Sequence, residues 1–76
     1  MNRPLLAKDG ATFHARVEPR GFNSFALSME VRLGDEKRHV ADVYTNLGSV
    51  RRVAADAAAG QPGGFDTVVW EGPSSP

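Results

Sequence analysis

The chain has 76 residues, no cysteine, and nine basic residues that balance nine acidic ones. A chain of this length forms one small domain and buries only roughly 60% of its unfolded surface, so we expect a small core and marginal stability. The lack of cysteine excludes disulfide scaffolds, thiolate metal sites and thiol redox chemistry, and it favours a cytoplasmic protein. The balanced charge provides no overall field toward nucleic acid or membranes, and the apolar stretch Leu5 to Ala7 is too short for a signal peptide or a membrane span.

Strict alternation of apolar and polar residues predicts two long strands. In residues 11–18 every second residue around Phe13 is apolar, which is the period of a half-buried strand. After a break that begins at Pro19, the same period returns in residues 25–33, which we expect to form a central strand. The inward side chains of this central strand would be Phe25, Leu27, Met29, Val31 and Leu33.

A third strand is predicted over residues 38–45, and two registers are open for it. A tight turn after Leu33 would turn Val40 and Tyr44 inward and would force Asp42 to the same side. A bulge near Lys37 would instead bring two other apolar residues inward, and we favour the bulge. Those two residues are Ala41 and Val43.

The period then changes to that of a helix. The alanine-rich run 54–59 has high helix propensity, and five apolar residues before and within it are spaced to share one face. These are Leu47, Val50, Val53, Ala54 and Ala57. Thr45, Asn46 or Ser49 would cap the start of the helix, and Gly60 in a left-handed conformation would end it. A last strand is predicted over Phe65 to Trp70, a disordered tail over 72–76, and a short first strand over Leu5 to Ala7.

These elements predict a single α+β domain over residues 1–71, in the order β-β-β-α-β. We expect a mainly antiparallel sheet of three to five strands with one helix packed on one face. The helix would carry the last strand to an edge, where it can pair in parallel. Since one helix covers only one face, the other face should present His14, Arg16, Ser28, Glu30, Arg32 and Arg38.

No residues frame a catalytic, metal or cofactor site, and we predict that the chain is not an enzyme. The glycines of residues 60–64 follow a helix, whereas a phosphate loop leads from a strand into a helix. His14 and His39 lack the cysteines or carboxylates of a metal set and are better explained as exposed strand histidines. Ser28, His14 and Asp42 are the types found in a catalytic triad, but no nucleophile elbow or oxyanion loop surrounds any serine.

Weaker signals point to a binding surface. Arg51 and Arg52 stand at the start of the predicted helix, where the dipole disfavours a cation by ~0.3–1 kcal/mol. They would contact an acidic or phosphate group, or else Arg52 pairs with Asp56 and Arg51 is solvated. Phe22, in the first long turn, is the aromatic residue most expected to be exposed, while Trp70 is expected in the core.

Further arginines are expected on the open sheet face, where Glu18 and Glu30 would form cross-strand pairs with them. Either Tyr44 or Trp70 would anchor an interface if a partner covered it. The complete set of predicted partner-binding residues is Arg51, Arg52, Arg16, Arg32, Arg38 and Phe22.

In size, lack of cysteine, neutral charge and the arrangement of strands around one helix, the whole chain resembles small accessory proteins of phages and plasmids, including anti-CRISPR inhibitors. The resemblance is one of format, so no functional residue is transferred from it. It implies stoichiometric binding to a host defence complex, without a cofactor and without chemistry. We therefore predict a non-enzymatic protein-binding module that acts through an edge strand, the open sheet face or the helix start.

Two alternatives belong to other classes. A nucleic-acid binder would use its sheet face or helix start, and in layout the chain resembles the sheet readers of phage integrase arm-binding domains, although the neutral charge argues against this. An enzyme, acting only as an accessory subunit, has no residues in its support. The exposed edges of so short a sheet also predict a homodimer, and no membrane association is expected.

Overall fold

The computed structural model describes residues 4–71, and the predicted tail 72–76 lies outside this range. Three long strands come first: β1 (Thr12–Gly21), β2 (Ser24–Leu33) and β3 (Glu36–Thr45). The helix α1 (Val50–Ala59) and a short last strand β4 (Val68–Glu71) follow. Two short 3-10 helices, η1 (Ala7–Asp9) and η2 (Leu47–Ser49), precede β1 and α1.

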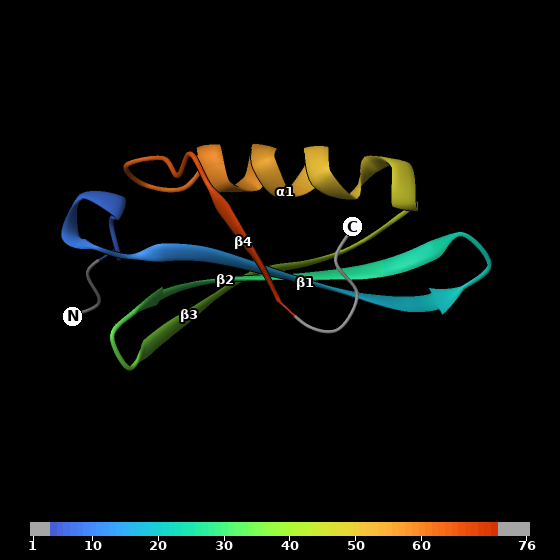
Figure 1. Ribbon diagram of the computed structural model, residues 1–76, viewed down its shortest axis with the longest axis horizontal. Coiled ribbons are helices and arrows are strands. Elements are labelled where there is room, and N and C mark those ends of the chain that lie inside the picture. Colours follow the sequence, from blue (N-terminus) through green and yellow to red (C-terminus); the bar gives the residue numbers. More distant parts are fainter. Residues whose placement is uncertain (1–3, 72–76) are drawn as a thin grey trace.

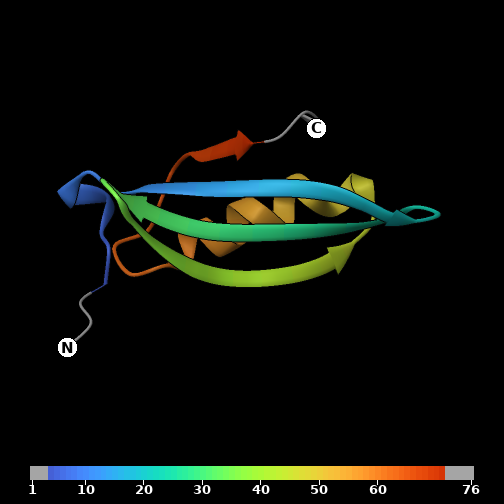
Figure 2. The same cartoon turned by 90° about the horizontal axis from the view of Figure 1, so that it is seen from below.

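The four strands form one sheet in the order β3-β2-β1-β4. The pairs β1–β2 and β2–β3 are antiparallel, and β4 pairs in parallel with the first half of β1. Figure 1 shows α1 lying along one side of the sheet, and Figure 2 shows the opposite side without a covering element. The predicted small α+β fold with one helix on one face is therefore confirmed.

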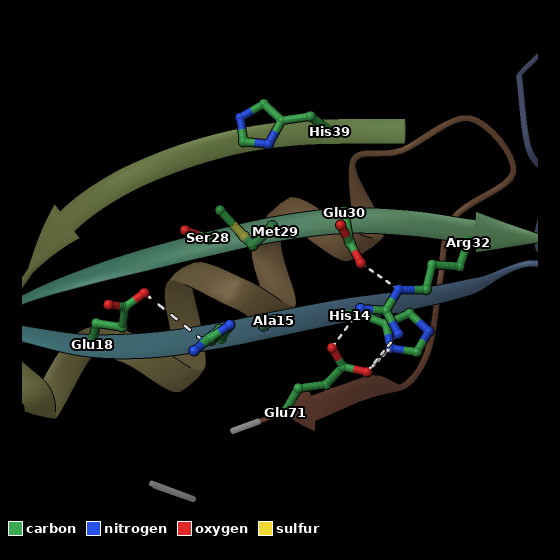
Figure 3. Close-up of a pocket in the computed structure, with 10 residues that line it drawn as sticks. His14, Ala15, Glu18, Ser28, Met29, Glu30, Arg32, His39 and Glu71 are labelled. Carbon is green, nitrogen blue, oxygen red and sulfur yellow. Dashed lines mark hydrogen bonds and ion pairs between the residues drawn. The ribbon is translucent and has the colours of Figure 1, made fainter. Parts of the chain in front are cut away.

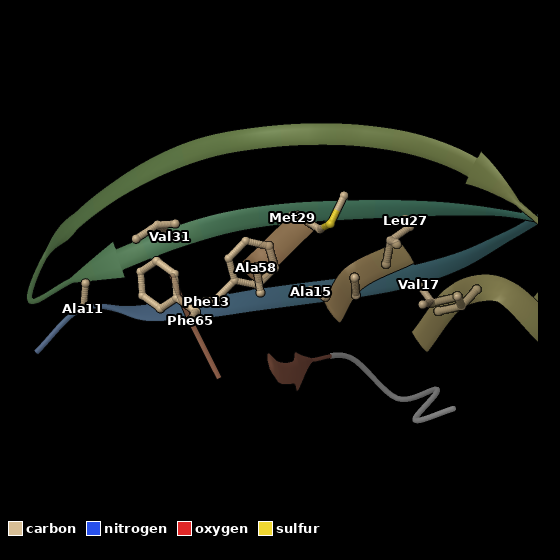
Figure 4. Packing of buried hydrophobic residues seen from close by; sticks show 11 residues of the cluster. Ala11, Phe13, Ala15, Val17, Leu27, Met29, Val31, Ala58 and Phe65 are labelled. Carbon is tan, nitrogen blue, oxygen red and sulfur yellow. The ribbon is translucent and has the colours of Figure 1, made fainter. Parts of the chain in front are cut away.

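The core lies between α1 and the helix-facing side of β1 and β2 (Figure 4). Phe13 and Leu27 are fully buried, and Met29 is 1% exposed, as the alternation in both strands predicts. Alanines on α1 let the helix approach the sheet closely, and Val50, Ala54 and Ala58 are its buried residues. Phe65, in the connection after α1, packs its ring on Phe13 at a centroid distance of 5.9 Å. Burial of a ring of this kind stabilises a fold by roughly 1.5–3 kcal/mol.

The third strand contains the bulge that the sequence favoured, but at a different residue. Ala41 pairs with Met29 and His39 pairs with Glu30, so Val40 is the extra residue and the bulge does not lie at Lys37. This shift turns Ala41 and Val43 toward the core and leaves Asp42 exposed, as the bulged register predicts.

The same register corrects the prediction for Arg38. Arg38 pairs across the ladder with Val31, whose side chain is buried under the helix, so Arg38 belongs to the helix side of the sheet and not to the open face. It lies on an outer strand, where its Nη2 donates to Glu36 Oε2 at 2.8 Å.

Four other sequence predictions are wrong in detail. The segment Leu5 to Ala7 forms no strand; it leads into η1. The last strand begins at Val68 and not at Phe65, because Phe65 turns into the core. Gly60 is not left-handed, since its φ is −81°, and the left-handed glycines of this connection are Gly63 and Gly64. Leu47, predicted on the buried face of the helix, is 51% exposed in η2.

Candidate partner-binding surface

One end of the open sheet face carries a network of side chains that hydrogen-bond one another (Figure 3). Arg32, on β2, reaches across β1 and donates to Glu71 on β4 through Nη1 at 2.7 Å and Nη2 at 2.5 Å. Its Nε donates to Glu30, two residues earlier on the same strand. All three guanidinium nitrogens of Arg32 are therefore hydrogen-bonded to carboxylates, which is the strongest geometry available to this side chain.

His14 continues the network along β1. Its Nδ1 lies 3.1 Å from Glu71 Oε2, and its Nε2 lies 2.6 Å from the hydroxyl of Thr12. The side chain of His14 is only 12% exposed, so the prediction of an exposed strand histidine is wrong for this residue. The parallel pairing of β4 with β1 explains the contact, because it places Val69 opposite His14 and Glu71 two residues further, on the same face and opposite Arg16.

The charges of this network hold each other in the ionised state. The hydrogen bonds from Arg32 are the main reason why the pKa of Glu71 is lowered, and the hydrogen bond to Glu71 is the main reason why the pKa of Arg32 is raised. A guanidinium and a carboxylate that satisfy each other so fully are poor contacts for a further ligand. The network's clearest role is to fasten β4 to the two long strands.

A shallow depression beside this network runs along the open face and includes Ser28 and His39 in its lining. Its polar groups do not form the triad that the sequence allows on paper, because His14 contacts Thr12 and Glu71 while Asp42 lies 3.4 Å from His39. No group of three or more metal-ligating side chains occurs within residues 4–71. The depression is thus lined by charges that are already paired.

The opposite end of the sheet has a different surface. The β1–β2 hairpin turns through Phe22 and Asn23, and the Asn23 φ of 53° is a left-handed value that asparagine tolerates. Phe22 is completely exposed, with a relative accessibility of 102%, as the sequence predicted. The turn projects at the right of Figure 1, beyond the end of β3. No contact with the rest of residues 4–71 explains an aromatic ring at this tip.

The start of the helix lies at the same end of the molecule (Figure 1). Asn46 caps η2, the 3-10 turn that leads into α1, since its Oδ1 accepts a hydrogen bond from the Ser49 amide at 3.0 Å, whereas Ser49 at the start of α1 itself makes no side-chain capping bond. Arg51 and Arg52 follow in the first turn and are both exposed. Within residues 4–71 no ion pair joins Arg52 to Asp56, so that interpretation of the helix-start cations is not supported.

We call this region the hairpin end and define it by Arg20, Phe22, Leu47, Arg51 and Arg52. It brings together three of the predicted partner-binding residues, namely Phe22, Arg51 and Arg52. The other three lie elsewhere: Arg16 is on the open face with Glu18 at 3.9 Å, Arg32 is in the network, and Arg38 is on β3. The pairs of Glu18 with Arg16 and of Glu30 with Arg32 lie within one strand and are not cross-strand pairs as predicted.

Sequence reasoning missed Leu47 and Arg20 as members of the hairpin end. Leu47 fits the helical period, and its exposure results from the 3-10 turn that precedes α1. The position of Arg20 results from the bulge in β1. Pro19 pairs with Phe25 and Gly21 pairs with Ser24, so Arg20 between them has no cross-strand partner. Trp70 is half-buried against the core, as expected, whereas Tyr44 is 67% exposed on the open face.

The helix found in residues 4–71 falls short of the length and apolar character that crossing a bilayer would require. Searches for similar proteins found no matching protein family, no matching curated protein and no matching solved structure. Arguments about function therefore start from the surfaces described above.

Proposed function

We propose that this protein is a small non-enzymatic binding module that attaches to another protein through its hairpin end. The observation that carries the proposal is the complete exposure of Phe22 at the tip of the projecting β1–β2 hairpin. Aromatic residues are among the strongest contributors to binding when a partner buries them. The two paired strands position the backbone that carries this ring, which lowers the entropic cost of association.

The open sheet face gives weaker support to the main alternative, a nucleic-acid binder that reads through its sheet. By register this face carries three basic residues, Arg16, Arg32 and Lys37, against four acidic ones. The acidic residues are Glu18, Glu30, Asp42 and Glu71. An excess of carboxylates repels a phosphate backbone, so this face suits a polyanion poorly.

The paired charges of the network also favour a binding role over an enzymatic one. Both carboxylates near His14 are committed to Arg32, so neither is left as a free acid or base in the depression. The action that fits such a module is stoichiometric occlusion of a larger partner. A mobile-element inhibitor of a host defence complex, of the anti-CRISPR kind, is the specific form that we propose.

Site-specific photo-crosslinking tests the proposal. Phe22 is replaced by the photoreactive analogue p-benzoylphenylalanine in living cells, and crosslinked proteins are identified by mass spectrometry. The matched control carries the same analogue at Asp35, which is exposed in the other strand-to-strand turn. We expect a defined adduct from position 22 and none from position 35. No adduct from position 22, or the same set from both positions, would contradict the proposed function.

The identified partner then allows the affinity to be measured. We expect Phe22→Ser to weaken binding by about 30-fold or more, since truncation of an aromatic anchor commonly costs at least about 2 kcal/mol. Asp35→Ser, at the opposite turn, is expected to leave the affinity unchanged.

A further inference from the structure

The neutral net charge hides an uneven distribution along the long axis of the molecule, which extends over 40 Å. Residues 19–24 and 45–53, which build the hairpin end, contain three arginines and no acidic residue, and Glu18, the residue before them, lies 3.9 Å from Arg20. The turns at the other end, residues 5–11, 33–38 and 60–67, contain three basic and four acidic residues. The hairpin end is therefore locally cationic although the chain as a whole is neutral.

The helix start adds to this positive potential. The first turn of α1 contains Arg51 and Arg52 and no acidic residue, although that position favours carboxylates. The unpaired amide groups of a helix N-terminus carry a partial positive charge of their own. The cationic side chains and the helix dipole thus act in the same direction at this end of the protein.

Apolar side chains lie among these cations. Phe22 and Leu47 are two of the four large apolar side chains that are exposed within residues 4–71, and both belong to the hairpin end. Leu47 lies in η2, four residues before Arg51, so an exposed apolar side chain directly precedes the cations at the start of the helix. A surface of this composition suits a partner that offers carboxylates around an apolar recess.

We infer that the partner of the hairpin end is an acidic protein surface with an apolar pocket that accepts the ring of Phe22. This inference rests on the proposed function and names the chemistry of the partner. Arg20, Arg51 and Arg52 would form the rim of the contact, and Phe22 and Leu47 its centre. The cations would steer the encounter and set its orientation, while the buried ring would supply most of the affinity.

A single-stranded nucleic acid is the other polyanion that could meet arginines beside an aromatic ring. Two features of the hairpin end favour a protein. It presents one aromatic ring, with the exposed Tyr44 on the open face of the sheet, whereas strand binders stack successive bases on several rings, and Leu47 offers an aliphatic contact that a base does not need. The acidic open face also leaves no basic path along which a phosphate backbone would continue.

The test uses defined probes and the full chain. The probes are a short glutamate-rich peptide containing two leucines, a lysine-rich peptide of the same pattern, and a single-stranded oligodeoxynucleotide of matched charge. Binding is followed by amide chemical shifts in 15N-labelled protein. We expect the glutamate-rich peptide to shift the amides of residues 20–23 and 47–52 and the lysine-rich peptide to leave them in place.

Charge reversal supplies the matched comparison. We expect the double variant Arg51→Glu/Arg52→Glu to weaken binding of the acidic peptide by about tenfold or more. The double variant Lys8→Glu/Lys37→Glu makes the same change in net charge at the other end, where both lysines are exposed, and should weaken it less than about twofold. Far-ultraviolet circular dichroism checks that both variants are folded.

Three results would overturn the inference: tighter binding of the oligonucleotide than of the acidic peptide, shifts confined to the open face, or equal effects of the two double variants. The crosslinked partner separates these failures from a failure of the proposed function. If Arg51→Glu/Arg52→Glu keeps full affinity for that partner while Phe22→Ser loses it, the acidic chemistry is wrong and the binding role stands. If neither variant changes the affinity, both proposals fail.

Discussion

Two of the three phenylalanines of the β1–β2 hairpin, Phe13 and Phe22, lie toward opposite ends of this molecule. Phe13, near the beginning of β1, is fully buried and packs on Phe65, with the hydrogen-bonded network of Arg32, Glu71 and His14 on the other face of the same strand. Phe22, at the hairpin turn, touches solvent on all sides. At the first end the ring is enclosed by neighbours, and at the second the ring is directed into solvent.

This difference separates residues that stabilise the fold from residues that are available to a partner. Arginine occurs at both ends, but Arg32 is enclosed by two carboxylates, whereas Arg52 has no acidic neighbour in its helical turn. Residue type alone does not identify a binding surface. The contacts already made by Arg32, and not by Arg52, are what distinguish these two arginines.

The largest expected effect is on stability and comes from the buried ring. Phe13→Ala should lower the free energy of unfolding by about 3–5 kcal/mol, because it removes a ring that is fully buried and leaves a cavity. Phe22→Ser should change it by less than about 0.5 kcal/mol. Urea denaturation followed by circular dichroism measures both. A large loss of stability in Phe22→Ser would show that the hairpin tip has a structural role, and it would contradict the contrast between Phe13 and Phe22.

A smaller effect is expected at the start of the helix. Asn46→Ala removes the side-chain acceptor of the Ser49 amide and should cost roughly 0.5–2 kcal/mol. Because Asn46 holds η2 at the hairpin end, Asn46→Ala should also weaken partner binding. Asn46→Asp should keep both the stability and the partner affinity. Thermal unfolding and the affinity for the crosslinked partner report the two quantities. Unchanged stability in Asn46→Ala would contradict the capping role.

The network should respond to acid. The pKa of Glu71 is lowered in the folded state, chiefly by hydrogen bonds from Arg32, so the unfolded chain takes up this proton more readily. The stability contributed by the pair is therefore present above pH 4.5, the ordinary value for this carboxyl, and is lost as the pH falls through the lower folded value. The stability lost at acid pH should be smaller in Arg32→Gln than in the unaltered protein. Denaturation curves at a series of pH values measure this difference. Equal pH profiles would contradict this assignment.

The same variant should act locally. In Arg32→Gln, amide hydrogen exchange of residues 68–71 should rise more than that of β2, because β4 has only a short parallel ladder and the partly buried Val68 and Trp70 to hold it besides this network. Uniform acceleration across the sheet would show that the network stabilises the whole domain instead of its last strand.

The smallest expected effect concerns self-association, and the homodimer stays a prediction. Val40 interrupts the ladder of the outer strand β3, and Arg20 with Pro19 interrupts β1 beyond the end of β4. Bulges and prolines at sheet edges discourage pairing with a second chain. We therefore expect at most weak association that depends on protein concentration, as measured by light scattering. A tight dimer at low concentration would contradict the protective role of these bulges.

Much of the fold follows from the spacing of apolar residues along the sequence. The alternation around Phe13 and around Leu27 predicts β1 and β2 and their buried faces, since one face of each strand is consistently apolar. The alternation is less consistent in β3, where a single extra residue exchanges the two faces. The bulge was predicted there, but its position at Val40 depends on pairing with β2.

The candidate site was less accessible to sequence reasoning. The exposure of Phe22 follows from its position among turn residues, and the helix-start cations follow from helical spacing. That these residues share one end depends on the direction of the helix over the sheet. The network was missed because Glu71 meets His14 only through the parallel register of β4, which no local pattern encodes.

The order of the strands also has a consequence for how the chain folds. Both antiparallel ladders join consecutive strands through tight turns, so their contacts are local and can form rapidly. The ladder between β1 and β4 instead closes a loop that contains nearly the whole domain, and it must await both hairpins and the helix. We therefore expect the three-stranded meander to form first. The pairing of β4 with β1, which brings Glu71 to Arg32, is then the final step of folding.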